Sequence, residues 1–193
     1  MVGGLALPVK LRFLGGGDKN YFQSPLTWSW ANFDGVHYLS IAAIGYQQFQ
    51  QAFFPFYSLL IKALSLNTGW NYINTGVLIS HVAFIAALFC LYKLLELDFG
   101  KKTYLIVALL LLFPASFYFA TVYTESLFLF FSCASFFAAR KEKWWLAGIF
   151  GGLASATKFI GIFLLPVLLI EYFSSRRYDV KWIWLLLIPI GLL

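Results

Sequence analysis

Long apolar runs separated by short polar segments fill this sequence from residue 72 to its last residue. A membrane helix needs about 20 predominantly apolar residues to cross a hydrocarbon core of about 30 Å. Runs of this kind predict an all-α fold, a polytopic transmembrane helical bundle. They cover residues 72–95, 103–122, 126–139, 144–157, 159–173 and 182–193.

The composition excludes most other classes of protein. Of the 193 residues, 61% are hydrophobic and only 11% are charged, whereas soluble domains carry about 25% charged residues. This excludes a soluble enzyme and a soluble nucleic-acid-binding domain, although a net charge of +6 would by itself fit a nucleic-acid partner. Most of the lysines and arginines lie in the short segments between apolar runs, which is how membrane topology is encoded.

The positions of the basic residues predict which helix ends face the cytoplasm. If the helices cross alternately, one face receives nine of the fourteen basic residues and the opposite face receives Asp34, the turn 123–125 and Lys158. This asymmetry follows the positive-inside rule, so the second face is predicted to be non-cytoplasmic. The shorter runs indicate tilted or broken helices, and Pro114 interrupts the run 103–122. The nine residues are Lys93, Lys101, Lys102, Arg140, Lys141, Lys143, Arg176, Arg177 and Lys181.

Residues 18–70 are predicted to form a large non-cytoplasmic first loop that carries interfacial helices. Their many aromatic side chains suit the membrane surface. Short helices are expected over 36–44 and 55–66, the second one starting at Pro55. With the transmembrane segments of 72–193, this loop would form a single domain. Both ends are expected to be incomplete, because the apolar stretches there (1–14, which includes Lys10 and Arg12, and 182–193) are too short to span.

Asp34 is the first candidate for chemistry, because only it and Asp18 are acidic in this loop. His37 follows three residues later and would share a helix face with Asp34. The local pattern leaves two roles open for Asp34, a cap of the following helix or a general base. The two roles are compatible, since a capping carboxylate stays ionised.

Two charged residues in apolar surroundings are further candidates. An acidic residue at mid-membrane costs up to about 3 kcal/mol, so Glu125 would face a cavity or a partner; alternatively, it is solvated at the outer interface. Lys158 lies against the positive-inside bias, so it either binds an anion or extends to the lipid headgroups. His81 is expected to be a helix-packing residue, and Cys90 and Cys133 to pack as small hydrophobes.

Asp34, Glu125 and Lys158 form a coherent chemical set. A carboxylate can take the proton from an attacking hydroxyl, and a cation can stabilise a leaving phosphate. No cysteine spacing typical of zinc and no Gly-rich phosphate loop is present, and the need for a metal stays open. The remaining acids are expected to be solvated charges beside basic residues: Glu96, Asp98, Glu142, Glu171 and Asp179.

Seven sequence blocks follow one another along the chain between about residue 30 and residue 166. They are WANFDGVHY at 30–38, IAAIGY at 41–46, FFPFY at 53–57, FPAS at 113–116, YTES at 123–126, LAG at 146–148 and LASATKFIG at 153–161. In the same order, these blocks resemble the PIG-V-like mannosyltransferases, the GPI mannosyltransferase II type. We interpret the chain as a fragment of a prokaryotic relative. The membrane would then be the cell membrane, or the endoplasmic reticulum membrane in a eukaryote.

The resemblance implies a GT-C membrane glycosyltransferase with its active site on the non-cytoplasmic face. Its donor would be a polyprenyl- or dolichyl-phosphate-linked hexose, with mannose expected, and its acceptor a glycolipid or glycan. By this analogy Asp34 is the catalytic base, His37, Tyr38 and Glu125 shape the acceptor site, and Lys158 meets the donor phosphate. No cofactor is implied beyond the donor, and the partners are membrane lipids and the two substrates.

Two residues depart from the family pattern. Lysine stands at 158 where arginine is usual, which keeps the charge but loses the bidentate fork to phosphate, and Ser58 replaces a frequent proline. The alternative hypothesis is a non-catalytic polytopic protein, transporter-like or an assembly subunit. In it, Glu125 and Lys158 would be a buried pair and Asp34 only a cap. A third hypothesis is a relative that glycosylates a lipid or a cell-wall polymer.

Overall fold

The computed structural model describes residues 24–100, 103–174 and 179–193, and within these ranges every regular element is a helix and no strand occurs. This confirms the all-α prediction. Seven charged residues of the predictions lie outside the described residues, as do the segment 1–14 and the start of the first loop. They are Lys10, Arg12, Asp18, Lys101, Lys102, Arg176 and Arg177.

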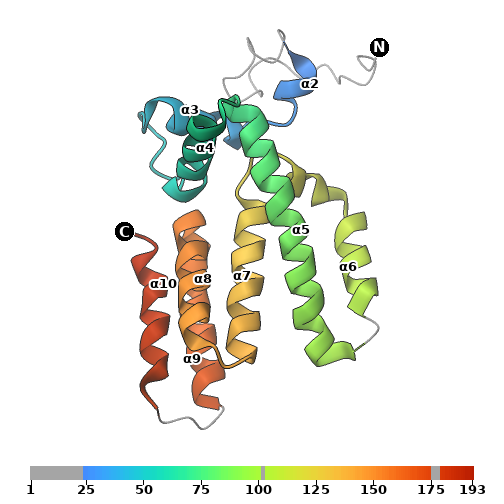
Figure 1. Cartoon of the computed structure of the whole chain (residues 1–193), viewed down its shortest axis with the longest axis vertical. Helices are drawn as coiled ribbons and strands as arrows, with labels where there is room; N and C mark the ends of the chain where they lie inside the picture. Colours follow the sequence, from blue (N-terminus) through green and yellow to red (C-terminus); the bar gives the residue numbers. More distant parts are fainter. Residues whose placement is uncertain (1–23, 101–102, 175–178) are drawn as a thin grey trace.

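Three roughly parallel helices form the centre of the fold, with α7 between α5 and α8 (Figure 1). A layer of shorter helices lies across one end of this bundle. The central helices are α5 (Tyr72–Phe99), α7 (Glu125–Arg140) and α8 (Trp144–Thr157). The end layer contains α2 (Pro25–Trp28), α3 (Asp34–Ile44) and α4 (Pro55–Thr68). The predicted helices at 36–44 and 55–66 are therefore confirmed within a few residues.

The remaining elements flank the centre on both sides. α6 (Thr103–Leu112) and the 3-10 helix η4 (Pro114–Ala120) lie beside α5, and the C-terminal elements lie beside α8 (Figure 1). These are η5 (Phe159–Phe163), α9 (Leu164–Ser174), η6 (Val180–Leu186) and α10 (Leu187–Ile190). Each apolar run of the sequence is thus helical.

Local sequence explains where several helices begin and end. Pro55 and Pro114 each stand at the first position of an element, where the missing N–H costs nothing. The Asn71 side chain accepts a hydrogen bond from the Asn74 N–H at 2.8 Å and caps α5. Gly69 ends α4 in the left-handed region, at φ 73°. The predicted break at Pro114 is confirmed, since α6 and η4 meet at 86°.

Small and hydroxylated residues hold the central helices close together. Ala87 of α5 and Ala147 of α8 are fully buried. The Ser135 hydroxyl of α7 donates to the Ala147 carbonyl across the helix pair at 2.7 Å. A methyl group added at Gly152 of α8 would lie 2.8 Å from the Leu187 carbonyl oxygen. The glycines of α8 therefore permit a close approach of the C-terminal helix, as small residues do in membrane bundles.

One described helix, α5, is long and apolar enough to cross a membrane by itself. The core helix of a soluble protein can meet the same criterion, but only 28% of the most apolar window of α5 is buried. α6 and η4 qualify only together, with their sharp bend. With 16 residues, α7 is about 24 Å long, shorter than a hydrocarbon core of about 30 Å. The multi-pass bundle therefore stays a prediction.

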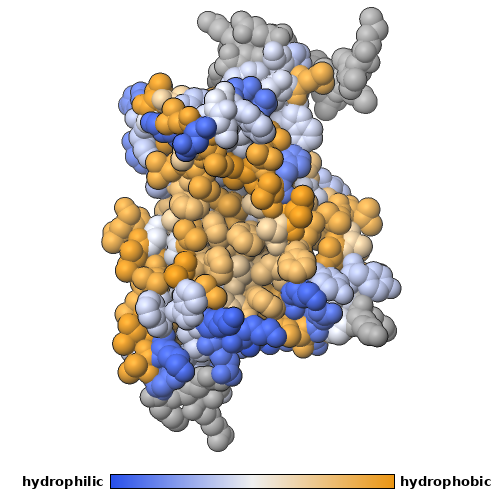
Figure 2. Space-filling view, viewed as in Figure 1, coloured by the Kyte–Doolittle hydropathy of each residue, from blue (hydrophilic) through white to orange (hydrophobic). Residues whose placement is uncertain are grey.

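The charged residues of the bundle lie at the two ends of its helices. At one end, Arg140 of α7 binds Asp98 of α5 at 2.8 Å and Glu171 of α9 at 3.1 Å. At the other end, Lys158 binds Glu125. Figure 2 shows a continuous apolar band over the helices between these ends. This arrangement fits the predicted separation of the basic residues from Asp34, Glu125 and Lys158.

Candidate functional site

The candidate site is formed where the end layer meets the bundle, by the start of α3, the turn 121–125 and the end of α8. The Val122 N–H donates to the Trp30 carbonyl at 2.8 Å. A methyl group at Gly35 would lie 3.2 Å from the Val122 carbonyl oxygen. These close backbone contacts place Asp34 beside the turn that leads into Glu125, although 91 residues separate them in the sequence.

Glu125 and Lys158 form an ion pair, with 2.7 Å between the Glu125 carboxylate and the Lys158 ammonium. Glu125 is the first residue of α7 and Lys158 directly follows α8, so the pair joins opposite ends of these two elements. The side chains are 31% and 38% exposed. The pair is therefore partly solvated, and the buried pair of the alternative hypothesis is not what the structure contains.

The backbone at Lys158 is extended, at φ −148° and ψ 138°. The chain reverses there into η5, and Gly161 packs directly on the end of α8. A methyl group at Gly161 would lie 2.5 Å from the Ser155 nitrogen, closer than any carbon can approach. The glycine thus allows the tight return that presents Lys158 to Glu125.

Asp34 is exposed at the first residue of α3. The N-cap position is occupied by Phe33, at φ 52°, and no side chain caps the helix. Of the two roles left open for Asp34, the cap is therefore not observed, since Asp34 lies one position after the N-cap. Its negative charge still lies in the first turn of α3, where it interacts favourably with the positive end of the helix dipole. The carboxylate remains accessible to a substrate.

Two tyrosines are influenced by both candidate carboxylates. Burial raises the pKa of Tyr38 to about 12, with Asp34 and Glu125 both adding to the rise and a hydrogen bond to Thr124 opposing it. Burial likewise raises the pKa of Tyr123 to about 12, again with contributions from Asp34 and Glu125. These contributions agree with the backbone contacts at Gly35 and Val122, which bring the start of α3 beside the turn that leads into Glu125.

The two tyrosines connect the parts of the site by their hydroxyls. The Tyr38 hydroxyl lies 3.4 Å from the Thr124 hydroxyl, and the Tyr123 hydroxyl donates to the Asn32 carbonyl at 3.1 Å. The Tyr38 ring is 5% exposed. Tyr38 therefore has a structural role in the site. The contact with an acceptor that the resemblance implies for Tyr38 stays a prediction.

His37 lies on α3 with its ring fixed by two neighbours. It stacks on Phe53, with 4.6 Å between ring centres. Its Nδ1 lies 3.4 Å from the Gln50 side-chain nitrogen, and Gln50 is itself buried. Gln50 is not identifiable from the sequence, since a glutamine in a polar loop carries no pattern that marks it as buried.

Ser58 has a structural role that the family's proline could not fill. Its hydroxyl donates to the Tyr38 carbonyl at 3.0 Å, which joins α4 to α3.

The sequence indicates Tyr123 only as part of a turn, and its position beside Asp34 depends on a contact over 89 residues of sequence. Such a contact leaves no local pattern.

The other predicted residues lie elsewhere. His81 is exposed, but its Nδ1 lies 2.8 Å from the Val77 carbonyl of its own helix and the centre of its ring lies 6.3 Å from that of the Trp30 ring, so it has partners in the chain although it is not buried. Cys133 is buried as expected and Cys90 is half-buried. Four of the remaining acids form partly exposed ion pairs: Glu96 with Lys93, Asp98 and Glu171 with Arg140, and Asp179 with Lys181.

In the described part of the chain, no three His, Cys, Asp or Glu side chains are grouped as a metal site would require. The site thus offers an accessible carboxylate, protonated phenols and a cation paired with a second carboxylate. Such a set can accept a proton and receive an anion.

No family model, curated protein or solved structure matches this chain.

Proposed function

We propose that this chain is part of an integral membrane glycosyltransferase. It transfers a hexose, with mannose as the first candidate, from a polyprenyl- or dolichyl-phosphate-linked donor to a glycolipid or glycan acceptor on the non-cytoplasmic face. The observation that carries the proposal is the convergence of Asp34 with the Glu125–Lys158 pair at one end of the bundle. The PIG-V-like sequence blocks support it, because they contain these three residues.

The membrane placement rests on the apolar surface and on the charge distribution. Large apolar side chains face outward along the helices; Phe89 is 66% exposed, Leu109 68% and Ile170 67%. Exposure of so many apolar side chains to water would be unfavourable, whereas their exposure to lipid is not. The short helices would cross a locally thinned bilayer or cross it with breaks. We therefore propose a multi-pass protein with the Arg140 end in the cytoplasm.

The proposed reaction is a direct displacement at the sugar. Asp34 takes the proton from the acceptor hydroxyl, whose oxygen attacks the anomeric carbon of the donor. The bond from that carbon to the phosphate oxygen breaks, and the electron pair leaves with the lipid phosphate. Lys158 stabilises the charge on this leaving group, and the configuration at the anomeric carbon inverts.

Glu125 holds the Lys158 ammonium in place before the donor binds. A lysine ammonium can contact a carboxylate and a phosphate together, because it has three N–H donors. Tyr38 and Tyr123 stay protonated at neutral pH, since the pKa of each is raised to about 12. They therefore support the site as neutral hydroxyls and leave proton removal to Asp34.

The test is sugar transfer by the full-length protein in nanodiscs, from polyprenyl-phosphate-mannose to a panel of glycolipid acceptors. Asp34→Asn is expected to lower the rate at least about 100-fold, the usual contribution of a general base. Because Asp34 is exposed and caps nothing, the variant should fold normally. Asp98→Asn is the control, since it removes the same charge at the opposite end. Equal transfer by wild type and Asp34→Asn would exclude Asp34 as the base.

A second candidate function, a non-catalytic membrane subunit, is favoured by one observation. Lys158 already has a partner in Glu125 at 2.7 Å, so the pair could serve only to join α7 to α8. In that case Glu125→Gln and Lys158→Met would weaken folding, and wild-type protein would transfer no sugar from any lipid-linked donor.

A further inference from the structure

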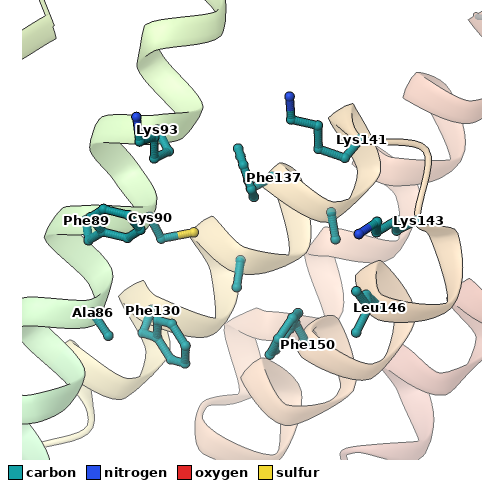
Figure 3. A pocket seen from close by; sticks show the side chains of 12 residues that line it. Ala86, Phe89, Cys90, Lys93, Phe130, Phe137, Lys141, Lys143, Leu146 and Phe150 are labelled. Atoms are coloured by element: carbon teal, nitrogen blue, oxygen red, sulfur yellow. The ribbon is translucent and has the colours of Figure 1, made fainter.

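A second site lies at the other end of the bundle, in a groove between α5, α7 and α8 (Figure 3). Its volume is about 520 Å³, within the usual range for ligand pockets. The groove wall is made largely of apolar side chains, and lysines lie at one end of it. From the geometry we infer that this groove binds an anionic phospholipid, with an acyl chain along the wall and the phosphate at the lysines.

The apolar part of the groove suits a hydrocarbon chain. Phe89 of α5, Phe130 and Phe137 of α7 and Phe150 of α8 line it. Phe89 is 66% exposed, so this helix face has no protein cover among the described residues. A membrane-embedded groove of this kind would be filled by lipid, because polar solvent is absent at that depth.

The charged end of the groove distinguishes an anionic lipid from a neutral one. Lys93 of α5 lines it, together with Lys141 and Lys143 of the connection between α7 and α8. Lys141 and Lys143 are exposed and flank the connection between α7 and α8. Lys93 binds Glu96 at 2.9 Å, and the Lys141 ammonium lies 5.7 Å from the centre of the Phe137 ring.

The location of these lysines matches the chemistry of the membrane. They lie at the end of the bundle that contains Arg140, which we place in the cytoplasm. The cytoplasmic leaflet carries anionic lipids, and basic pockets between membrane helices on that side bind their headgroups. A free phosphate ion would leave the apolar wall empty, and a zwitterionic lipid would bring its own cationic group beside the lysines. The inference rests on the proposed membrane placement but not on glycosyl transfer.

Native mass spectrometry of the detergent-purified full-length protein tests the inference. Dioleoylphosphatidylglycerol and dioleoylphosphatidylcholine are added in equal amounts, and the retained lipids are counted. Wild type is expected to retain dioleoylphosphatidylglycerol, the anionic lipid, preferentially. The double variant Lys141→Gln/Lys143→Gln should lose about fivefold in affinity for each lysine removed. Lys181→Gln, a loss of charge at the same end but outside the groove, should retain the lipid like wild type.

Two further arms separate binding in the groove from nonspecific attachment of lipid and from binding of phosphate alone. Ala86→Phe adds a ring at the groove wall and should also reduce retention, whereas inorganic phosphate should not compete. Any of three results would overturn the inference: equal retention of both lipids, competition by phosphate alone, or unchanged retention in Ala86→Phe. The lysine variants should keep sugar transfer, because they are remote from Asp34. If wild type transfers sugar but shows no preference between the two lipids, only the lipid-binding inference is contradicted. If wild type prefers the anionic lipid but transfers no sugar, only the proposed glycosyltransferase activity is contradicted.

Discussion

The Lys158 ammonium lies 2.7 Å from the Glu125 carboxylate, and this pair joins the start of α7 to the end of α8 at the same end of the bundle as Asp34. Since both side chains are about one-third exposed, the pair contributes little to stability. Folding stability alone therefore gives little reason for two opposite charges at this position.

The first prediction concerns the strength of this pair. A double-mutant cycle with Glu125→Gln and Lys158→Met should give a coupling energy of no more than about 1 kcal/mol, typical of solvated pairs. Thermal unfolding in detergent measures it. A buried pair would instead cost about 3–5 kcal/mol when one partner is removed. A coupling of that size would favour the non-catalytic role.

Substitutions at Lys158 should separate binding from chemistry. Lys158→Arg keeps the charge and adds a bidentate fork for phosphate, so it is expected to keep or raise sugar transfer, while Lys158→Met abolishes it. The comparison is made by transfer rate at saturating and limiting donor. Equal rates for wild type and both variants would exclude Lys158 from donor binding.

Two serines on α7 offer a matched test of the packing between helices. The Ser135 hydroxyl donates to the Ala147 carbonyl, so Ser135→Ala should lower the free energy of unfolding by about 1 kcal/mol. The Ser132 hydroxyl is buried without a partner among the described residues, so Ser132→Ala should be neutral or stabilising. Denaturation in mixed micelles measures both changes, and equal losses would contradict the assigned bonds.

Gly161→Ala should disturb the reversal that presents Lys158. The added methyl group would lie 2.5 Å from the Ser155 nitrogen, and such overpacking typically costs about 1–3 kcal/mol. Transfer activity should fall with stability. Ile160→Ala is the control, because Ile160 is 55% exposed and its loss should leave both unchanged.

The proximity of Asp34 to Tyr123 has a spectroscopic consequence. The pKa of Tyr123 is raised to about 12 by burial first and by Asp34 next, so Asp34→Asn should lower it. Absorbance titration of tyrosinate, with Tyr123→Phe as the reference for assignment, follows this pKa. The raised pKa also contributes stability that is present below pH 10 and is lost as the pH rises through the folded value near 12. An unchanged Tyr123 pKa in Asp34→Asn would place the carboxylate elsewhere.

Much of the helical order was predictable because apolar runs and proline positions report it directly. The limits of α8 agree with the run 144–157, and Pro114 ends α6 where its ring forbids a continuous helix. Charge spacing also placed Glu125 and Lys158 at one end. These features depend on short-range patterns that the sequence displays.

The contacts across the site were not predictable in the same way. The sequence left open whether Asp34 caps α3 or acts as a base, and the N-cap position is taken by Phe33 with its strained backbone, one residue earlier. The contact of Gln50 with His37 depends on how the loop between α3 and α4 folds back, and that of Tyr123 with Asn32 depends on how the end layer docks on the bundle. Docking of this kind is set by tertiary packing, which leaves no periodic signal.

The single Arg140 guanidinium connects α5, α7 and α9 through two partly exposed ion pairs at the end away from Asp34. At the opposite end the ion pair between α7 and α8 is the Glu125–Lys158 contact. Because the Lys158 ammonium has N–H donors beyond the one directed at Glu125, a donor phosphate can bind it while the pair persists. Donor binding should therefore leave the spacing of α7 and α8 unchanged and add only local charge neutralisation at this end.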